Sequence, residues 1–410
     1  MTVPLSCDVV IVGAGLAGLA AARVLHAAGR NVHVVDAAHE VGGRVRSERI
    51  DGFTVDCGFQ VLLTAYPEVE RQLNVPALRL QSFDQGAGVW IDGKEHRVSD
   101  PFRSPASLPG ALVAPIGSPI DKVRVALMRR RLLRSPSPQL LRGDDVATIT
   151  ALRARGFSTT MIDRFFRPLF GGIQLDTGLS TSARMFDVIF KSLSEGGSAV
   201  PADGMAAIPQ QLASHLPPDR LHLGRRVQEV TGTTVQLDGG NVIDASAVVV
   251  AVEGPEAARL IGTRAVGSRP ATAVWFAAPR PPVDHKLVML TSNGPAANVA
   301  VMSNVAPSYA PDGQALIVAA LPGVDDPHAE AGVRIQLAAM FGPKVADWRH
   351  LRTHAIAHGQ PDQSPPLRPK RRVSLGEGLF VCGDHRDTGS IQGALYSGRR
   401  TAEAVLAMPR

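Results

Sequence analysis

The sequence predicts an α/β protein in which a three-layer domain with a mostly parallel sheet is joined to a domain of mixed α+β structure. Three observations support this fold class. The chain has 410 residues, more than a single hydrophobic core usually accommodates. A β-branched apolar run near the N-terminus leads into a glycine-rich turn and then into a segment rich in Ala and Leu. Further β-branched runs recur beyond residue 220.

The first element is a strand, turn, helix and strand between Val9 and Asp36. The run Val9–Val12 predicts a strand, residues 16–28 predict a helix, and a second strand ends at Asp36. The GxGxxG spacing of the turn permits a sharp bend, close approach of backbone to a pyrophosphate, and close helix packing. The first N–H groups of the helix would face the phosphates. The predicted cofactor-binding residues of this turn are Gly13, Ala14, Gly15, Ala17 and Gly18.

Asp36 follows Gly15 by 21 positions. A carboxylate at this point accepts hydrogen bonds from a ribose with a free 2′-OH and repels a 2′-phosphate. Together with the flanking strands, the acid favours a dinucleotide-binding unit. The alternative is an ordinary βαβ turn without a ligand.

Composition excludes several classes of protein. No window approaches roughly 18 uninterrupted apolar residues, and the first seven residues hold no Lys or Arg. We therefore expect a cytoplasmic protein without a signal peptide or a spanning helix. A dispersed formal charge of +6, with three Tyr and three Trp, argues against a nucleic-acid partner.

The cysteines and histidines predict neither disulfides nor a metal. The three cysteines, Cys7, Cys57 and Cys382, lack CxxC spacing, so we expect reduced thiols. The 12 histidines show no HExxH or comparable spacing. We expect no metal site.

One basic segment has a helical pattern. "DKVRVALMRRRLLRS", from Asp121 to Ser135, contains five arginines beside apolar positions. One interpretation is a peripheral membrane contact through Val123–Leu133 on anionic lipid. The other, which we favour, is a surface helix with solvated arginines.

The later strands predict how the domains are assembled. They lie at Arg220–Val230, Thr233–Val252 and Gly378–Asp384. We expect them to complete the nucleotide-binding sheet, which gives a discontinuous domain of residues 1–80, 200–260 and 365–410. Residues 81–199 and 261–364 would form the substrate domain, with the substrate cavity at the domain boundary.

A second glycine motif follows Asp36. In "GGRVRS", Gly42 and Gly43 allow close passage of the backbone, and Arg44 can neutralise a pyrophosphate. The alternative is a Gly-Gly turn with a surface arginine.

The run GAGLAG, then Asp36, VGGR and "DGFTVDCGFQ" resembles the flavin amine oxidase, phytoene desaturase and protoporphyrinogen oxidase superfamily. The resemblance implies a Rossmann-like FAD-binding domain. It places Gly58, Phe59 and Gln60 near the flavin ring. "VPADGMAAIPQQLASHL" is similar to the PxGGM segment of the family, with Asp203 in place of one glycine. Val227, after the basic pair in "GRRVQEV", corresponds to its adenine-clasping position.

The closing segment "LFVCGDHRDTGSIQGALYSGRR" selects FAD over NAD. A strand ends at Gly383 and Asp384, and the resemblance assigns this acid to the ribityl and pyrophosphate side. A helix begins near Ser390, so its first N–H groups, around Ile391 and Gln392, would favour negative charge on reduced flavin. No cysteine lies at the position where some amine oxidases of this superfamily attach their flavin covalently, so we expect FAD to be bound non-covalently.

The expected reaction is hydride transfer from an organic substrate to flavin N5. Amine oxidases of this superfamily hold a lysine just before the strand that here begins near Arg269, and none occurs there. Tyr396 is the only Tyr or Trp in the C-terminal flavin segment, and its position favours packing. We therefore favour desaturase-like CH–CH oxidation of an apolar, isoprenoid-like substrate, in a cavity lined by Phe165–Ile173 and Trp275–Ala278.

Two other functions stay open: amine oxidation with oxygen, and a non-redox flavoprotein isomerase. The electron acceptor is oxygen or a quinone. No residue is assigned as catalytic.

Overall fold

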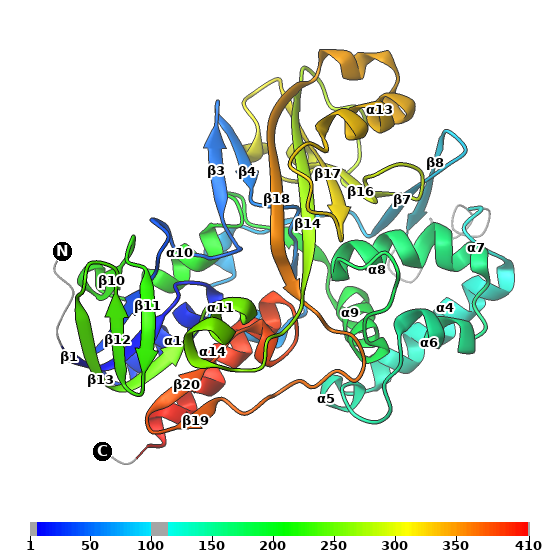
Figure 1. Ribbon diagram of the computed structural model, residues 1–410. Coiled ribbons are helices and arrows are strands. Elements are labelled where there is room, and N and C mark those ends of the chain that lie inside the picture. Colours follow the sequence, from blue (N-terminus) through cyan, green and yellow to red (C-terminus); the bar gives the residue numbers. More distant parts are fainter. Residues whose placement is uncertain (1–5, 100–113, 409–410) are drawn as a thin grey trace.

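The computed structural model describes residues 6–99 and 114–408 (Figure 1). It confirms the predicted α/β class, because two large sheets are combined with helical layers. Residues 100–113 of the predicted substrate domain lie outside the described part. Within that part, no helix is long and apolar enough to cross a membrane.

The first sheet is mostly parallel at its centre. In spatial order it contains β10 (Leu221–His222), β2 (Val32–Val35), β1 (Ser6–Val12), β13 (Val242–Val250), β12 (Thr234–Leu237) and β11 (Val227–Thr231). The strand β20 (Leu379–Val381) pairs in parallel with β13, and β19 (Ser374–Gly376) pairs with β20. Because β1 is parallel to both β2 and β13, three strands end at one edge of the sheet.

Apolar packing on both faces explains the continuous hydrophobic run of β1. Val9 and Ile11 belong to the cluster that contains the buried residues of α1 (Leu16–Ala27), α10 (Ala207–Ala213) and α14 (Ile391–Leu406). Val10 and Val12 belong to a second cluster with Ala257 and Leu260 of α11 (Gly254–Ile261). The sheet is thus the middle of three layers, as predicted.

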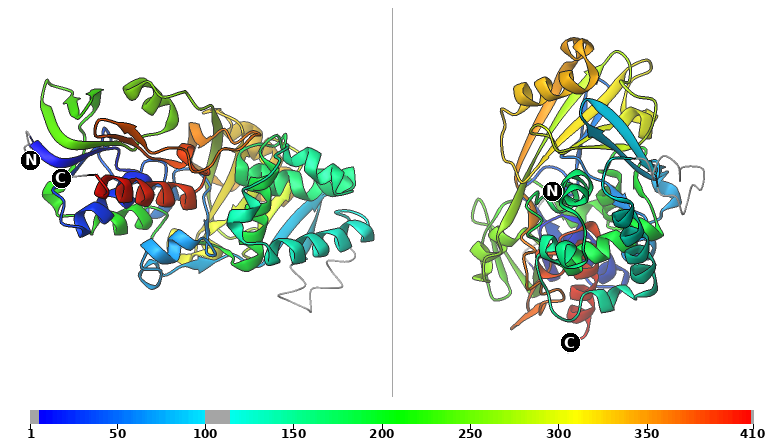
Figure 2. Two further views of the ribbon diagram at one scale, coloured as in Figure 1. Left: turned by 90° about the horizontal axis from the view of Figure 1, so that it is seen from below. Right: turned by 90° about the vertical axis from the view of Figure 1, so that its right-hand side faces the viewer.

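The second sheet is mainly antiparallel. Its order is β18 (Arg349–Pro361), β14 (Ser268–Ala278), β17 (Ala315–Pro322), β16 (Asn298–Val301), β15 (Val288–Thr291), β7 (Gly86–Ile91) and β8 (Lys94–Ser99). One face packs on α13 (Glu330–Phe341), and the other faces the helical region. Figure 2 shows α13 and the helical region on opposite sides of this sheet.

The helical region follows β8 in the chain. It contains α4 (Pro119–Arg134), α5 (Ser137–Leu140), α6 (Thr148–Ala154), α7 (Thr159–Met161), a π-helical segment (Ile162–Phe166), α8 (Arg167–Gln174) and α9 (Ala183–Glu195). The remaining α-helices and strands of the described residues are α2 (Pro67–Gln72), α12 (Met302–Val305), the hairpin of β3 (Ser47–Ile50) and β4 (Phe53–Asp56), and a small sheet of β5 (Leu62–Leu63), β9 (Ser198–Val200) and β6 (Gln81–Ser82).

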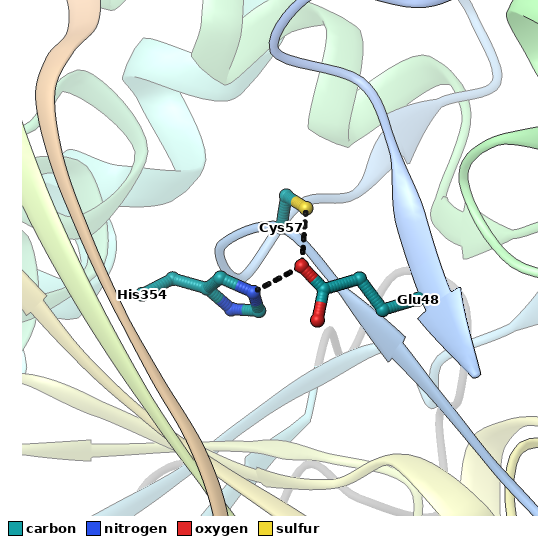
Figure 3. A group of neighbouring side chains, drawn as sticks. All are labelled: Glu48, Cys57 and His354. Atoms are coloured by element: carbon teal, nitrogen blue, oxygen red, sulfur yellow. Dashed lines mark hydrogen bonds and ion pairs between the residues drawn. The ribbon is translucent and has the colours of Figure 1, made fainter. Parts of the chain in front are cut away.

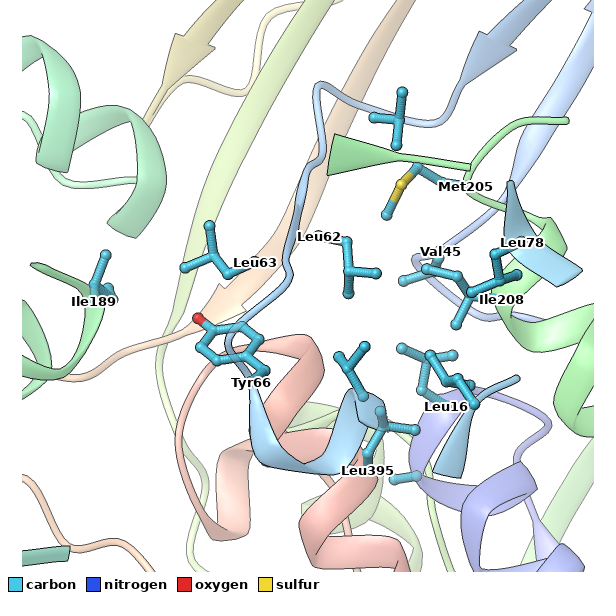
Figure 4. Packing of buried hydrophobic residues seen from close by; sticks show 14 of the residues in the cluster. Leu16, Val45, Leu62, Leu63, Tyr66, Leu78, Ile189, Met205, Ile208 and Leu395 are labelled. Carbon is cyan, nitrogen blue, oxygen red and sulfur yellow. The ribbon is translucent and has the colours of Figure 1, made fainter. Parts of the chain in front are cut away.

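Segments far apart in sequence meet in one core. Figure 4 shows Leu16 of α1, Leu62 of β5, Ile208 of α10 and Leu395 of α14 packed together. All four side chains are buried. The first sheet therefore depends on both ends of the chain, although the predicted domain boundaries themselves stay a prediction.

Candidate active site

A cavity of about 1070 Å³ extends from the carboxyl edge of the first sheet to the helices α4, α8 and α9. Typical ligand sites have volumes of roughly 300–1,000 Å³. The cavity is therefore large enough for two ligands side by side.

The glycine turn after β1 forms one wall. Gly13 has φ +112°, and a Cβ there would lie 2.9 Å from the carbonyl oxygen of Ala251. Gly15 is the N-cap of α1, so its position exposes the first N–H groups of the helix. At Gly18 a Cβ would lie 1.9 Å from the oxygen of Gly13, so only glycine allows this packing. The sharp turn predicted at Gly13 and the close helix packing predicted at Gly18 match this geometry, and the approach of a pyrophosphate at Gly15 stays a prediction.

Asp36 follows β2 and faces the cavity. Its Oδ2 accepts a hydrogen bond of 2.6 Å from the N–H of Ala14, and its Oδ1 accepts one of 2.7 Å from Ala38. These bonds fix the carboxylate beside the glycine turn. It lies where a ribose at the end of the turn would find an acceptor.

Arg44 connects the two ends of the chain. Its Nη2 donates to Oδ1 of Asp384 at 2.7 Å, and its Nη1 donates to the carbonyl of Gly359 at 2.8 Å. Gly42 and Gly43 have φ of +118° and +59°, which allows the loop to reach within van der Waals contact of Gly15. The alternative interpretation, a Gly-Gly turn with a surface arginine, is therefore wrong, because Arg44 is held in the cavity wall.

The segment after β4 forms the next part of the wall. Gly58 has φ +95°, and Gln60 donates from Nε2 to the carbonyls of Arg44 and Cys57 at 2.7 and 3.0 Å. Gln60 thereby holds two loops together. Its own side chain lies beside Gly58 and Phe59 in the wall.

The C-terminal segment closes the same wall. Gly383 and Asp384 follow β20, and Ser390 caps α14 by accepting from the N–H of Gly393 at 3.0 Å. Ile391 lines the cavity, but the side chain of Gln392 turns away to accept from the N–H of Glu68 at 2.9 Å.

The structure brings together most of the residues predicted from the sequence. Those in the cavity wall are Gly13, Gly15, Ala17, Asp36, Gly42, Gly43, Arg44, Gly58, Phe59, Gln60, Gly383, Asp384 and Ile391. Those outside it are Ala14, Gly18, Val227 and Gln392. Val227 is buried in the cluster beneath α11, and its predicted contact with adenine stays a prediction.

One predicted part of the lining is wrong. Trp275–Ala278 are almost fully buried within the sheets and do not reach the cavity. The wall is formed instead by Ala271–Ala273, nearer the start of β14. The far end of this strand packs between core clusters, since alternate residues face α13 and the helical region.

Other wall residues were missed. Glu253 lies three residues after the end of β13, and polar residues at the carboxyl edge of a parallel sheet are a recognisable signal. Gly359 and Gln360 come from the end of β18, for which the sequence carries no such signal.

The residues fit a flavin dinucleotide. Two helix N-termini, those of α1 and α14, border the same cavity, and such termini favour bound anions and developing negative charge. The glycines carry no side chain, so their backbone leaves room for a dinucleotide to approach closely. Arg44, which is paired with Asp384, brings a positive charge to the same wall.

The model of the family described as flavin-containing amine oxidoreductases matches residues 16–406. The chain belongs to this family. The predicted superfamily and enzyme class, an FAD-dependent oxidoreductase, are thereby confirmed.

Short segments resemble curated oxidases. Putrescine oxidase of Kocuria rosea is 41% identical over 92 residues, which are 22% of this chain and 19% of that protein. L-amino-acid oxidase of Crotalus adamanteus is 39% identical over 103 residues, 24% and 20% of the two chains. The matched segments thus span about a fifth of these relatives.

Solved structures resemble the whole chain. A double mutant of putrescine oxidase has a TM-score of 0.74 at 19% identity, over 98% of this chain and all (100%) of the other. An oxidoreductase from Methanosarcina mazei has a TM-score of 0.76 at 18% identity, over 97% and 100%. At these identities the likeness establishes the fold.

We predict that Asp36→Ala and Arg44→Ala each weaken FAD retention without unfolding the protein. Each removes a charge-assisted contact worth roughly 1.5–3 kcal/mol. The flavin-to-protein ratio after gel filtration measures the effect. Asp312→Ala is the matched control, because Asp312 is an exposed acid outside the cavity wall. Wild-type ratios for both test variants would refute the assigned roles.

Proposed function

We propose that the protein oxidises an apolar organic substrate in a desaturase-like CH–CH reaction, with an isoprenoid-like compound as substrate. When bound, FAD supplies a ring nitrogen, N5, that accepts a hydride. The observation that carries the proposal is the apolar wall beyond the flavin-binding end of the cavity. It includes Phe165, Leu169, Phe170, Ile173, Ile189 and Phe190.

Aromatic rings that pack on one another form part of this wall. Phe170 stacks on Phe190 with ring centroids 6.1 Å apart and contacts Phe186 at 4.3 Å. The rings of Phe165 and Phe166, in the π-helical segment, meet edge to face at 5.5 Å. Such a wall orients an apolar chain by shape and excludes water from the reacting bond.

Amine oxidation is the second candidate, and family membership together with the oxidase relatives favours it. The cavity wall offers less support. The segment before β14 carries no lysine, and Tyr396 lies outside the wall, beside Lys370, Arg399 and Arg400. A non-redox isomerase is the third candidate.

We further propose that α4 rests on an anionic membrane, in place of the solvated surface helix that the sequence alone favoured. Ile120, Val123 and Leu127 are 61%, 59% and 60% exposed and share one helix face. Arg130, Arg131 and Arg134 are exposed near the C-terminal end of the same helix, which complements anionic headgroups.

The same helix lines the cavity. Pro119, Val123 and Ala126 belong both to α4 and to the cavity wall. A lipophilic substrate, and a quinone if that is the acceptor, could pass from the bilayer into the cavity along this helix. Leu132, in the predicted contact segment, is instead buried in the core.

We predict that purified protein is yellow and that acid precipitation leaves the colour in solution. Burial raises the pKa of the Cys57 and Cys382 thiols to about 11 and about 12, so neither is a reactive thiolate near neutral pH. Absorbance of the supernatant and pellet measures the partition. Colour that stays in the pellet would show covalent attachment.

We predict that an isoprenoid bleaches the flavin under anaerobic stopped-flow mixing, whereas putrescine and simple monoamines do not. Ile173→Gln should slow bleaching by at least about tenfold, because a polar group in the apolar wall must be desolvated. Ile335→Gln, at an exposed position of α13, is the matched control.

Rapid bleaching by an amine, with isoprenoids inert, would establish the second candidate. Turnover of an isoprenoid isomer without bleaching would establish the third.

We predict that the protein sediments with phosphatidylglycerol vesicles and that a triple Ser variant of Ile120, Val123 and Leu127 does not. Each buried aliphatic side chain contributes roughly 1.5–3 kcal/mol, so binding should weaken at least about 100-fold. Ile335→Ser should sediment like the wild type. Equal sedimentation of the triple variant would exclude this surface.

A further inference from the structure

Three potential metal ligands meet beside the cavity. Figure 3 shows Glu48, Cys57 and His354 pointing toward one another. Oε1 of Glu48 lies 3.4 Å from Nε2 of His354 and 4.0 Å from Sγ of Cys57. The three ligand atoms all lie within 4.8 Å of one another.

Three different segments supply these side chains. Glu48 is in β3, Cys57 directly follows β4, and His354 is in β18. Cys57 is a free thiol and is 8% exposed, and the side chain of His354 is 12% exposed. Glu48 is 40% exposed, so an ion could reach the cluster from solvent.

We propose that Glu48, Cys57 and His354 bind one Zn²⁺ ion, with water as the fourth ligand. Thiolate, imidazole and carboxylate are the ligand types that zinc takes in tetrahedral sites. Zn–S of about 2.3 Å and Zn–N or Zn–O of about 2.0–2.1 Å place tetrahedral ligands roughly 3.3–3.6 Å apart. The Glu48–His354 distance of 3.4 Å already matches, and the Glu48–Cys57 distance of 4.0 Å has to shorten by about half an ångström.

The neighbouring charges leave one carboxylate oxygen for the metal. Nη2 of Arg352 lies 3.1 Å from Oε2 of Glu48, on the other oxygen of that carboxylate. Such an outer contact orients the ligand toward the ion. The ion displaces the proton of the Cys57 thiol to solvent, so the bound thiolate and the carboxylate balance the two positive charges.

The bound ion would join the β3–β4 hairpin to β18 of the second sheet. Cys57 precedes Gly58 in the cavity wall, and Ile356 of β18 lies in the same wall. A side-chain Cβ at Gly58 would lie 3.0 Å from Cδ1 of Ile356, so the two segments are already in close contact. The ion is a link between them that the oxidation itself does not require.

The site would be missed in the sequence because its ligands are separated by up to about 300 positions, without local spacing. The proposed zinc site departs from our expectation, based on the sequence, that the protein has no metal site. It is also independent of the substrate proposed above, because the test measures metal binding alone.

The test is titration of the FAD-loaded protein with Co²⁺, which replaces Zn²⁺ and reports thiolate ligation by a near-ultraviolet charge-transfer band, read in difference spectra against the same protein without metal so that flavin absorption cancels. We expect one equivalent to bind, with visible bands at longer wavelength than flavin absorption. Zn²⁺ should abolish these bands by displacing Co²⁺. Competition with a chelator of known affinity gives the dissociation constant.

Cys57→Ser, His354→Ala and Glu48→Gln should each weaken metal binding at least about tenfold. Loss of a residue that only supports a ligand typically lowers metal affinity about 10- to 100-fold, and loss of the ligand itself should cost at least as much. Cys7→Ser is the control, since Cys7 lies in β1 away from the cluster. Flavin content and circular dichroism identify any variant that fails to fold. Absence of stoichiometric binding by the wild type, or an unchanged thiolate band in Cys57→Ser, would overturn the proposal.

Discussion

The site depends on one constraint: the parallel pairing of β1 with β2 and β13. Parallel strands present their carboxyl ends at a common edge. Because β20 pairs in parallel with β13, Gly383 and Asp384 reach the same edge as Gly13 and Asp36. The chain therefore returns its last segment to its first, and the N-termini of α1 and α14 border one cavity. Gly383 and Asp384 would not reach this edge if β20 lay elsewhere.

The edge alone forms only one part of the cavity wall. Another part comes from the second sheet, since β14 and β18 supply Ala271–Ala273, Ile356 and Gln360. The Arg44–Asp384 ion pair and the bond from Arg44 to Gly359 connect these two parts. Arg44 thus links the two sheets. This position explains why the arginine follows a pair of glycines, whose positive φ values let the loop turn inward.

The parts of the fold that could be predicted carry local signals. The glycine turn needs glycine for steric reasons, β1 is apolar on both faces, and Ser390 begins α14 as its N-cap. These signals act within a few residues, so the sequence shows them. The apolar wall has no such signal. Trp275 looked suitable for it by composition, but the register of β14 against β17 and β18 buries it in the core. Glu48 and His354 meet only because the β3–β4 hairpin lies against β18.

A buried polar network holds that hairpin in place. Asp56, at the end of β4, accepts hydrogen bonds from the hydroxyls of Ser47 and Tyr309 at 2.6 and 3.0 Å and from the N–H of Met205 at 2.9 Å. Burial raises the pKa of Asp56 to about 6, although these three donors oppose the shift. The donors come from β3, from the segment after α12 and from the segment before α10. The carboxylate of Asp56 therefore ties the hairpin to two distant parts of the chain, directly before Cys57. The hydrogen bonds of the buried Asp56 carboxylate therefore fix the position of the cavity wall at Gly58 as much as the backbone conformation of that glycine does.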